Sequence, residues 1–254
     1  MANVQIQFIN ESTVLTDDQV RATVAALQTQ VHRDFAPEWG IDVDLALVGS
    51  DEHPSGAWRI VVLDDSDQAG ALGYHDLTIE GLPLGKVFAK TTMQYGGHWT
   101  VTASHELLEM LGDPDINRAV FVPASHGRHG EGTIVAYENC DACEADQFGY
   151  DIDDTRVSDF VFRAWFESFR APGSTQFDFC NYINAPFELL TGGYIGVYDV
   201  MSGRGWTQVT AEQAPMTYDM RPPIGSRRER RKTPRDQWLR SSVAKEEQVA
   251  QPGV

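Results

Sequence analysis

A histidine and two glutamates lie at metal-binding spacing between residues 104 and 115. The segment reads Ser-His-Glu-Leu-Leu-Glu-Met-Leu-Gly-Asp-Pro-Asp, in which His105 and Glu109 are one helical turn apart. Residues at this spacing project from the same face of a helix. Imidazole and carboxylate groups both bind divalent cations, and Glu106 could accept a proton from water on the ion. The segment therefore predicts a helical metal site with His105 and Glu109 as ligands and Glu106 as the catalytic base.

This pattern resembles the motif of the metzincin metalloproteases, His-Glu-x-x-His-x-x-Gly-x-x-His/Asp. The chain has Glu109 in place of the second histidine, a glycine at the turn and Asp115 at the last position. The resemblance implies that Asp115 is the third ligand, beside His105 and Glu109. It also implies a methionine turn beneath the metal, for which Val-Met-Ser at 200–202 is the candidate.

A second resemblance offers other third ligands. Many bacterial and fungal sequences similar to metallopeptidases carry His-Glu-Leu-x-Glu-Ala-x-Thr-Asp-Pro and, further on, Glu-Ile-Gly-Asp-x-Cys. This chain has His-Glu-Leu-Leu-Glu-Met-Leu-Gly-Asp-Pro at 105–114 and Glu-Asn-Cys-Asp-Ala-Cys at 138–143. The match is closer than the metzincin one because two motifs agree in order. It implies Glu138 or Asp141 as the third ligand, with Asp113 orienting the helix end. The whole chain also resembles a family of bacterial and phage-associated proteins built around this helix.

The ligand set decides which ion and which activity to expect. One histidine and two carboxylates form a harder, more negative set than two histidines, so Mn²⁺ or Ca²⁺ could bind as well as Zn²⁺. The resemblance implies a zinc-dependent peptidase, in which water activated by the ion attacks a peptide carbonyl. The alternative is a non-catalytic structural or assembly component, of the virion or injection-system type, that retains the helix for stability.

Other metal-binding side chains have simpler interpretations. His75 and His98 flank the expected site, but a lone histidine is more often structural. Seven carboxylates between residues 138 and 154 favour a solvated acidic loop, because they lack the spacing of an EF-hand loop. Cys140 and Cys143 lack the second cysteine pair of a zinc knuckle, which favours their burial as small apolar groups.

Two predicted helices must position the site. Thr16 is the predicted N-cap of a helix over 16–35 that closes at Pro37. The site helix covers 100–111, where Gly112 favours a left-handed residue just past the end. An ordinary amphipathic helix with a solvated acidic face also explains this segment, but not the agreement with the downstream motif.

Strands complete the predicted fold. Alternating residues predict strands at 3–9, 42–48, 58–64, near 85–89, and at 133–138, 157–165 and 193–200. Residues 68–76 read as a glycine-rich loop. The strands need a cover on one face, and the two helices are the available covers. We therefore predict an α/β (α+β) fold similar to the zincins, with a mixed sheet, a backing helix, an active-site helix and an irregular C-terminal half.

Charge divides the chain into an acidic body and a basic tail. Residues 1–225 hold 12 Lys and Arg against 33 Asp and Glu, a net charge of −21, whereas residues 226–254 hold 8 against 4. The acidic body suits cations and repels nucleic-acid phosphates. We predict one metal-binding domain over 1–225, with halves at 1–112 and 113–225. The flexible tail would dock through its Trp-Leu pair on its own domain, on a second copy or on an assembly partner.

Features of membrane and secreted proteins are absent from the sequence. No run approaches the roughly 18–20 apolar residues of a membrane span. The N-terminal residues lack the basic and apolar regions of a secretory signal. We expect a cytoplasmic protein, or a virion-associated one if it is phage-encoded, with a peptide or protein substrate and no membrane or nucleic-acid partner.

Overall fold

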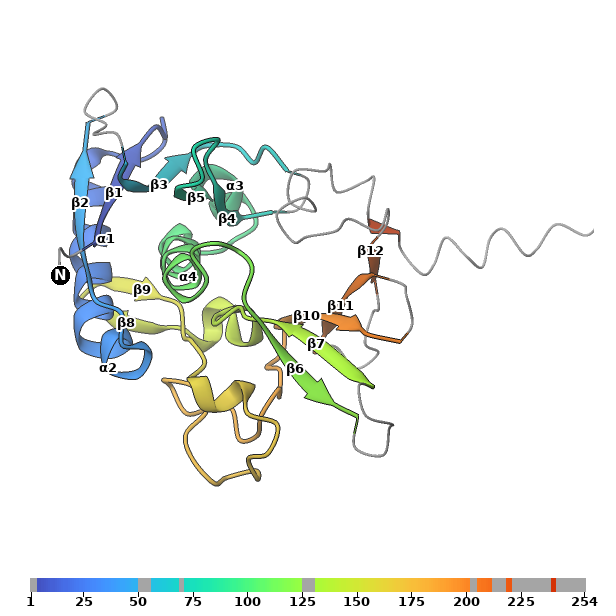
Figure 1. Ribbon diagram of the computed structural model, residues 1–254. Coiled ribbons are helices and arrows are strands. Elements are labelled where there is room, and N and C mark those ends of the chain that lie inside the picture. Colours follow the sequence, from blue (N-terminus) through green and yellow to red (C-terminus); the bar gives the residue numbers. More distant parts are fainter. Residues whose placement is uncertain are drawn as a thin grey trace, which may run out of the picture.

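The first half of the chain forms a mixed sheet of five strands in the order β2-β1-β3-β5-β4 (Figure 1). These are β1 (Val4–Asn10), β2 (Val43–Val48), β3 (Trp58–Leu63), β4 (Gly73–Leu77) and β5 (Pro83–Phe88). Four strands are parallel, and β4 pairs antiparallel with β5 at one edge. The strands predicted from alternation in this half are confirmed. The loop predicted over 68–76 is wrong from residue 73 onward, where the chain forms β4. This segment has no β-branched residue that would predict a strand, and its pairing with β5 holds it extended.

The computed structural model describes only part of the chain. The described residues are 4–49, 56–68, 71–124, 131–201 and 205–211, with the backbone alone of 218–220 and 239–240. None of the described helices has the length and hydropathy that crossing a bilayer requires. Of the predicted basic tail, only Leu239–Arg240 belongs to these residues, and its Trp238 anchor lies outside them.

The backing helix begins at the predicted residue but runs past the predicted end. It comprises α1 (Asp17–Thr29), a π-helical segment η1 (Gln30–Phe35) and α2 (Ala36–Trp39). The Thr16 hydroxyl accepts from the Gln19 amide at 3.3 Å, and Gln19 Oε1 accepts from the Thr16 amide at 2.9 Å. Pro37 does not end the helix, because it lies in the first turn of α2, where a missing amide proton is tolerated. Gly40, with a φ of 68°, ends it.

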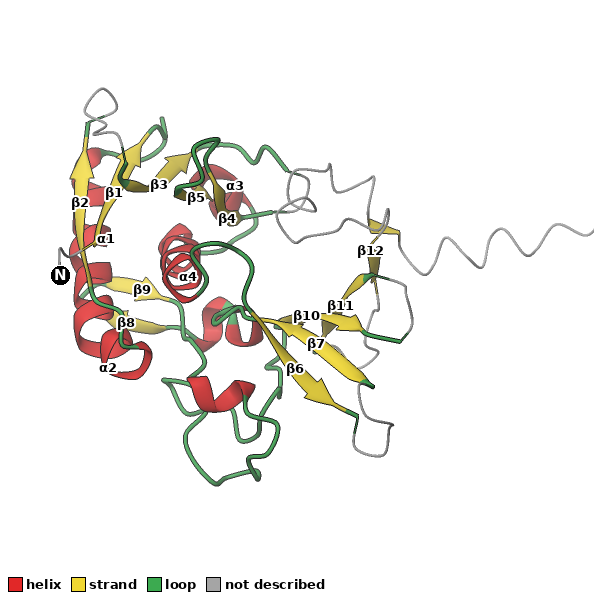
Figure 2. Ribbon diagram, viewed as in Figure 1, coloured by secondary structure: helices red, strands yellow, loops and turns green. Residues whose placement is uncertain are grey.

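The site helix α4 (Trp99–Gly112) follows the short helix α3 (Ala89–Gln94) and packs against β3, β4 and β5. Figure 2 shows α4 between the mixed sheet and the small sheet of β8 (Tyr150–Ile152) and β9 (Thr155–Val157). Ser104 Oγ donates to Gln30 Oε1 at 2.7 Å and so joins α4 to the backing helix. Both predicted covers of the sheet are confirmed. Gly112 is a helical residue of α4, so the left-handed conformation expected there is wrong.

The second half is more regular than expected. An antiparallel sheet has the order β13-β12-β11-β10-β7-β6. Its strands are β6 (Ala119–Pro123), β7 (Gly132–Ala136), β10 (Tyr194–Asp199), β11 (Trp206–Thr210), β12 (Tyr218–Met220) and β13 (Leu239–Arg240). The short helices are η2 (Asp141–Cys143), η3 (Asp146–Phe148) and η4 (Arg163–Phe166). The strand predicted over 157–165 is wrong after Val157, because the aromatic residues that follow pack into the core around η4 instead of pairing in a ladder.

One hydrophobic core contains side chains of both halves. Trp39, Leu107, Phe160 and Trp165 are buried in it together. Trp39 Nε1 donates to the carbonyl of Val161 at 3.2 Å, across the two halves. Aromatic rings of this size bury a large apolar area each, so their shared packing holds the second half against the site helix.

Candidate metal centre

Two histidines and five carboxylates gather where α4 meets β4 and the chain that follows β7. Six of these side chains are buried and the seventh, that of Glu144, is half-buried. The members are His75, His105, Glu106, Glu109, Glu138, Asp141 and Glu144. We call these seven residues the acidic cluster. Within it, potential ligand atoms of two groups lie within 4.8 Å of one another: His75, Glu109 and Glu138 in one, and His105, Asp141 and Glu144 in the other.

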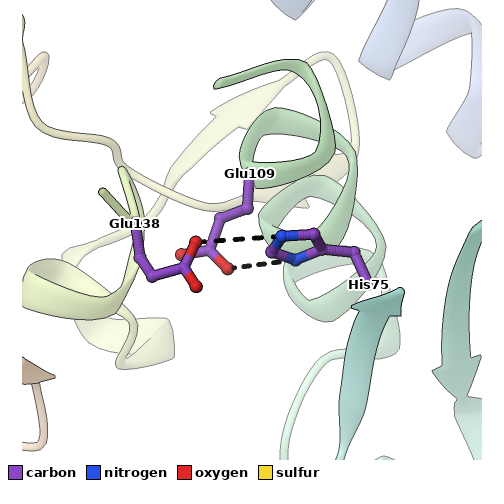
Figure 3. Close-up of side chains that lie close together, drawn as sticks. All are labelled: His75, Glu109 and Glu138. Atoms are coloured by element: carbon purple, nitrogen blue, oxygen red, sulfur yellow. Dashed lines mark ion pairs between the residues drawn. The ribbon is translucent and has the colours of Figure 1, made fainter. Parts of the chain in front are cut away.

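The first group brings together three different elements. Figure 3 shows the carboxylates of Glu109, from α4, and Glu138, from the segment after β7, facing the imidazole of His75 from β4. Glu109 Oε2 lies 3.5 Å from His75 Nδ1, and Glu138 Oε2 lies 3.8 Å from His75 Nε2. Ligand atoms bonded to one Zn²⁺ at about 2.1 Å in a tetrahedron are about 3.4 Å apart. The two separations involve different nitrogens of His75, so the side chains would have to move for one nitrogen and both carboxylates to bind one cation. One ligand atom of each residue already lies within 4.8 Å of the others, which makes the group a candidate site.

The second group is centred on the other histidine. His105 Nε2 lies 3.3 Å from Glu109 Oε2 and 3.3 Å from Asp141 Oδ1. Burial lowers the pKa of His105, but the charge of Glu109 and hydrogen bonds to Asp141 and Glu109 outweigh it and raise that pKa well above 6.5. One carboxylate oxygen of Glu109 therefore faces both imidazoles, and Glu109 lies between the two groups.

Asp141 has an environment that disfavours its charged form. Burial, followed by the charge of Glu109, raises the pKa of Asp141 to about 6. The Tyr194 phenol donates a hydrogen bond to the Asp141 carboxylate. Burial and the charges of Asp141 and Glu144 raise the pKa of Tyr194 well above 10, which keeps this donor protonated. A cation beside Asp141 would favour the ionised carboxylate.

Close contact between α4 and β4 aims His75 into the cluster. His75 and Gly73 are two residues apart on one strand, so they share a face. A Cβ atom at Gly73 would lie 2.6 Å from Thr102 Cγ2 and 2.8 Å from Glu106 Oε1. The glycine thus lets α4 approach the strand, and His75 Nδ1 lies 3.6 Å from Glu106 Oε2.

Hydrogen bonds fix the segment after β7 on α4. Asn139 Nδ2 donates to the carbonyl of Leu108 at 2.9 Å, and the Cys140 amide donates to Glu109 Oε1 at 3.3 Å. This leaves Glu109 Oε2 directed at the histidines. A Cβ atom at Gly112 would lie 2.5 Å from Asn139 Nδ2, so the glycine at the helix end makes room for this segment.

Four predicted ligands and the predicted base lie in the acidic cluster. These are His105, Glu109, Glu138, Asp141 and Glu106. Asp115 is exposed and belongs to neither group, so we do not retain it as a ligand. Met201, the candidate for the methionine turn beneath the metal, is 69% exposed and so does not underlie the cluster, and Ser202 of that segment lies outside the described residues.

The remaining predicted groups have structural contacts. Asp113 accepts hydrogen bonds from the amides of Asn117 and Arg118, each at 3.0 Å, and so shapes the turn after α4. His98 lies outside the cluster and its Nδ1 is 2.7 Å from Asp146 Oδ2. Cys140 and Cys143 are buried, as predicted, and burial raises the pKa of both thiols.

His75 and Glu144 were not among the predicted ligands. His75 stands alone in the sequence, and Glu144 is one of many carboxylates in its segment. The sequence feature that could have pointed to His75 was Gly73, two residues before it. A glycine on the same face of a strand as a histidine lets the strand approach a helix closely. For Glu144 the sequence held no such feature.

Comparisons with known proteins leave the family open. No family model matches the sequence, no curated protein matches it, and no solved structure matches the fold. The likeness to zincins therefore remains a prediction from the motifs. What the arrangement can do follows from its chemistry: it can hold a divalent cation and place an acidic side chain beside it.

Proposed function

We propose that the protein is a metal-dependent hydrolase of peptide bonds, whose cation is held by His75, Glu109 and Glu138. The observation that carries the proposal is the gathering of four buried carboxylates and one half-buried carboxylate with two buried imidazoles in the acidic cluster. Removing an ion from water costs several kcal/mol, and like charges close together add to that cost. A divalent cation among these groups would offset both penalties.

Each side chain then has a distinct role. When bound, the cation would polarise the substrate carbonyl and lower the pKa of an attacking water molecule. Glu106 belongs to neither ligand group, yet its Oε2 lies 3.6 Å from His75 Nδ1. Its carboxylate is therefore placed to take the proton from that water and to pass it to the leaving amine.

The choice of peptide bonds as the substrate rests on the motifs. The His-Glu-Leu-Leu-Glu helix and the downstream Glu-x-x-Asp-x-Cys are similar to those of metallopeptidases. The structure supports their joint use, because Glu138 of the second motif lies beside Glu109 of the first, and Asp141 lies beside His105. Oxygen-rich ligands with one imidazole suit Zn²⁺ or Mn²⁺.

Glu106→Gln is the direct test of this function. We expect the variant to bind Zn²⁺ or Mn²⁺ as the wild type does, because Glu106 is not a ligand. Its turnover of a peptide library should fall by about 10²–10⁴-fold, the usual contribution of a general base. Metal content by mass spectrometry and cleavage by product analysis would be measured on the same preparations.

Glu167→Gln is the matched control, because it makes the same change at a carboxylate whose Oε2 pairs with Arg170 away from the cluster. It should retain both metal and turnover. Wild-type protein that binds metal but cleaves no peptide would favour the alternative, a structural or assembly component. Wild-type protein that binds no divalent cation would contradict the proposal.

A further inference from the structure

We propose that the acidic cluster holds two adjacent divalent cations, with the second bound by His105, Asp141 and Glu144 and with Glu109 between the two. The inference rests on the proposed function, since the first cation is the one placed at His75, Glu109 and Glu138. The second position has its own imidazole and its own carboxylates, all contributed by α4 and by the end of the segment after β7.

The geometry of Glu109 is that of a bridging carboxylate. Its Oε2 lies 3.5 Å from His75 Nδ1 and 3.3 Å from His105 Nε2, so it contacts a candidate ligand of each ion. The two imidazoles belong to separate groups of candidate ligand atoms, His75 with Glu138 and His105 with Asp141 and Glu144, which gives two positions on either side of Glu109. In two-metal hydrolytic sites the ions are about 3.5–4 Å apart. A single shared carboxylate spans that distance.

Charge balance favours two ions over one. The cluster contains five carboxylates, and an imidazole that binds a cation does so in its neutral form, so it offsets none of their charge in the metal-bound state. One divalent cation balances two carboxylates, and a second balances two more. Because uncompensated charge is most costly where water is excluded, the second ion stabilises the part of the cluster that the first leaves acidic.

Contacts around the second position orient its ligands. Tyr194 of β10 donates to Asp141, and the Cys140 amide holds Glu109 Oε1, so that both carboxylates keep one oxygen engaged. Outer contacts of this kind fix the orientation of metal ligands. A second ion would also supply Lewis acidity that a single carboxylate-rich site lacks.

Counting Mn²⁺ bound to the full chain tests the inference. Protein freed of metal and then saturated with Mn²⁺ should hold two ions per chain, measured by mass spectrometry and isothermal titration calorimetry. Electron paramagnetic resonance should show a spin-coupled pair. Glu144→Gln and Asp141→Asn should each reduce the count to one and remove the coupling. Glu138→Gln should also leave one ion, at the other position, and Glu167→Gln should keep two.

The outcomes separate this inference from the proposed function. One ion in the wild type, unchanged by Glu144→Gln and by Asp141→Asn, would overturn the two-ion site and leave the hydrolase proposal standing. Two ions without spin coupling would overturn it as well, because they would not be adjacent. No ion at all would overturn both. Circular dichroism of every variant verifies the fold, and two independent substitutions at the second position guard against one that unfolds.

Discussion

Two aspartates away from the acidic cluster share a buried environment. Asp159 and Asp178 both have no exposed surface. Burial, followed by a hydrogen bond to Asp178 and the charge of Asp178, raises the pKa of Asp159 to about 8. The Asp178 carboxylate accepts from the amides of Tyr182 and Ile183, each at 2.8 Å. We therefore expect Asp159 to hold the proton of this pair at neutral pH.

This pair predicts a pH dependence of stability. In unfolded protein the Asp159 pKa is near 3.8, so between that pH and about 8 the folded chain holds one proton more. The free energy of unfolding should then fall as pH rises through this window, by up to about 1.4 kcal/mol per unit, and level off above it. Asp159→Asn mimics the protonated form and should flatten the curve. Urea unfolding from pH 5 to pH 9, with EDTA present, measures it.

Asp65→Asn is the control, since Asp65 is exposed and pairs with Lys90 at the surface. It should keep the wild-type slope. Parallel curves for wild type and Asp159→Asn would show that Asp159 is not the group responsible.

At the scale of elements, the contact between the end of α4 and the segment after β7 assembles the site. Asn139 bonds to the carbonyl of Leu108, and Gly112 leaves room for its amide. These contacts hold the segment on α4, with Glu138 beside Glu109 and Asp141 beside His105. The contact is tight, and a single methyl group should disturb it.

Gly112→Ala tests that contact. Alanine normally stabilises a helix relative to glycine by about 1 kcal/mol. Here its Cβ would lie 2.5 Å from Asn139 Nδ2, so we expect a loss of about 1–3 kcal/mol and weaker metal binding. In the Asn139→Ala background the same change should cost nothing further. Urea unfolding of the four proteins of this double-mutant cycle gives the coupling, and additive losses would contradict the contact.

Across the whole molecule, the candidate ligands come from both halves of the chain. His75 and Glu109 belong to the first half, and Glu138, Asp141 and Glu144 to the second. A cation bound by these side chains only in the folded chain would therefore tie the mixed sheet and α4 to the second half. Its contribution would add to that of the shared hydrophobic core.

Removing metal should consequently lower stability. At a free cation concentration one hundred times the dissociation constant, one ion contributes about 2.7 kcal/mol. We expect the thermal midpoint to rise with added Zn²⁺ or Mn²⁺ and to fall with EDTA. Glu109→Gln should respond far less, because Glu109 contacts ligands of both groups. A wild-type midpoint that is the same in EDTA and in saturating cation would refute the coupling.

Local patterns in the sequence determined the main elements. The Thr16 capping box and the spacing behind it predicted α1, and the leucines of α4 predicted the site helix. These inferences succeed because a cap and a helical repeat act between residues a few positions apart. The same repeat placed His105 and Glu109 on one face, and the second motif offered Glu138 or Asp141 as the third ligand, both of which lie in the acidic cluster.

Only the tertiary structure decided the rest. His75 enters the cluster because β4 pairs antiparallel with β5 and α4 packs on it at Gly73, contacts between segments far apart in the chain. Asp115 lies outside the acidic cluster, because the turn in which Asp113 accepts from the Asn117 amide leaves Asp115 exposed. Both outcomes depend on long-range packing, which sets the burial and direction of a side chain and which no local spacing encodes.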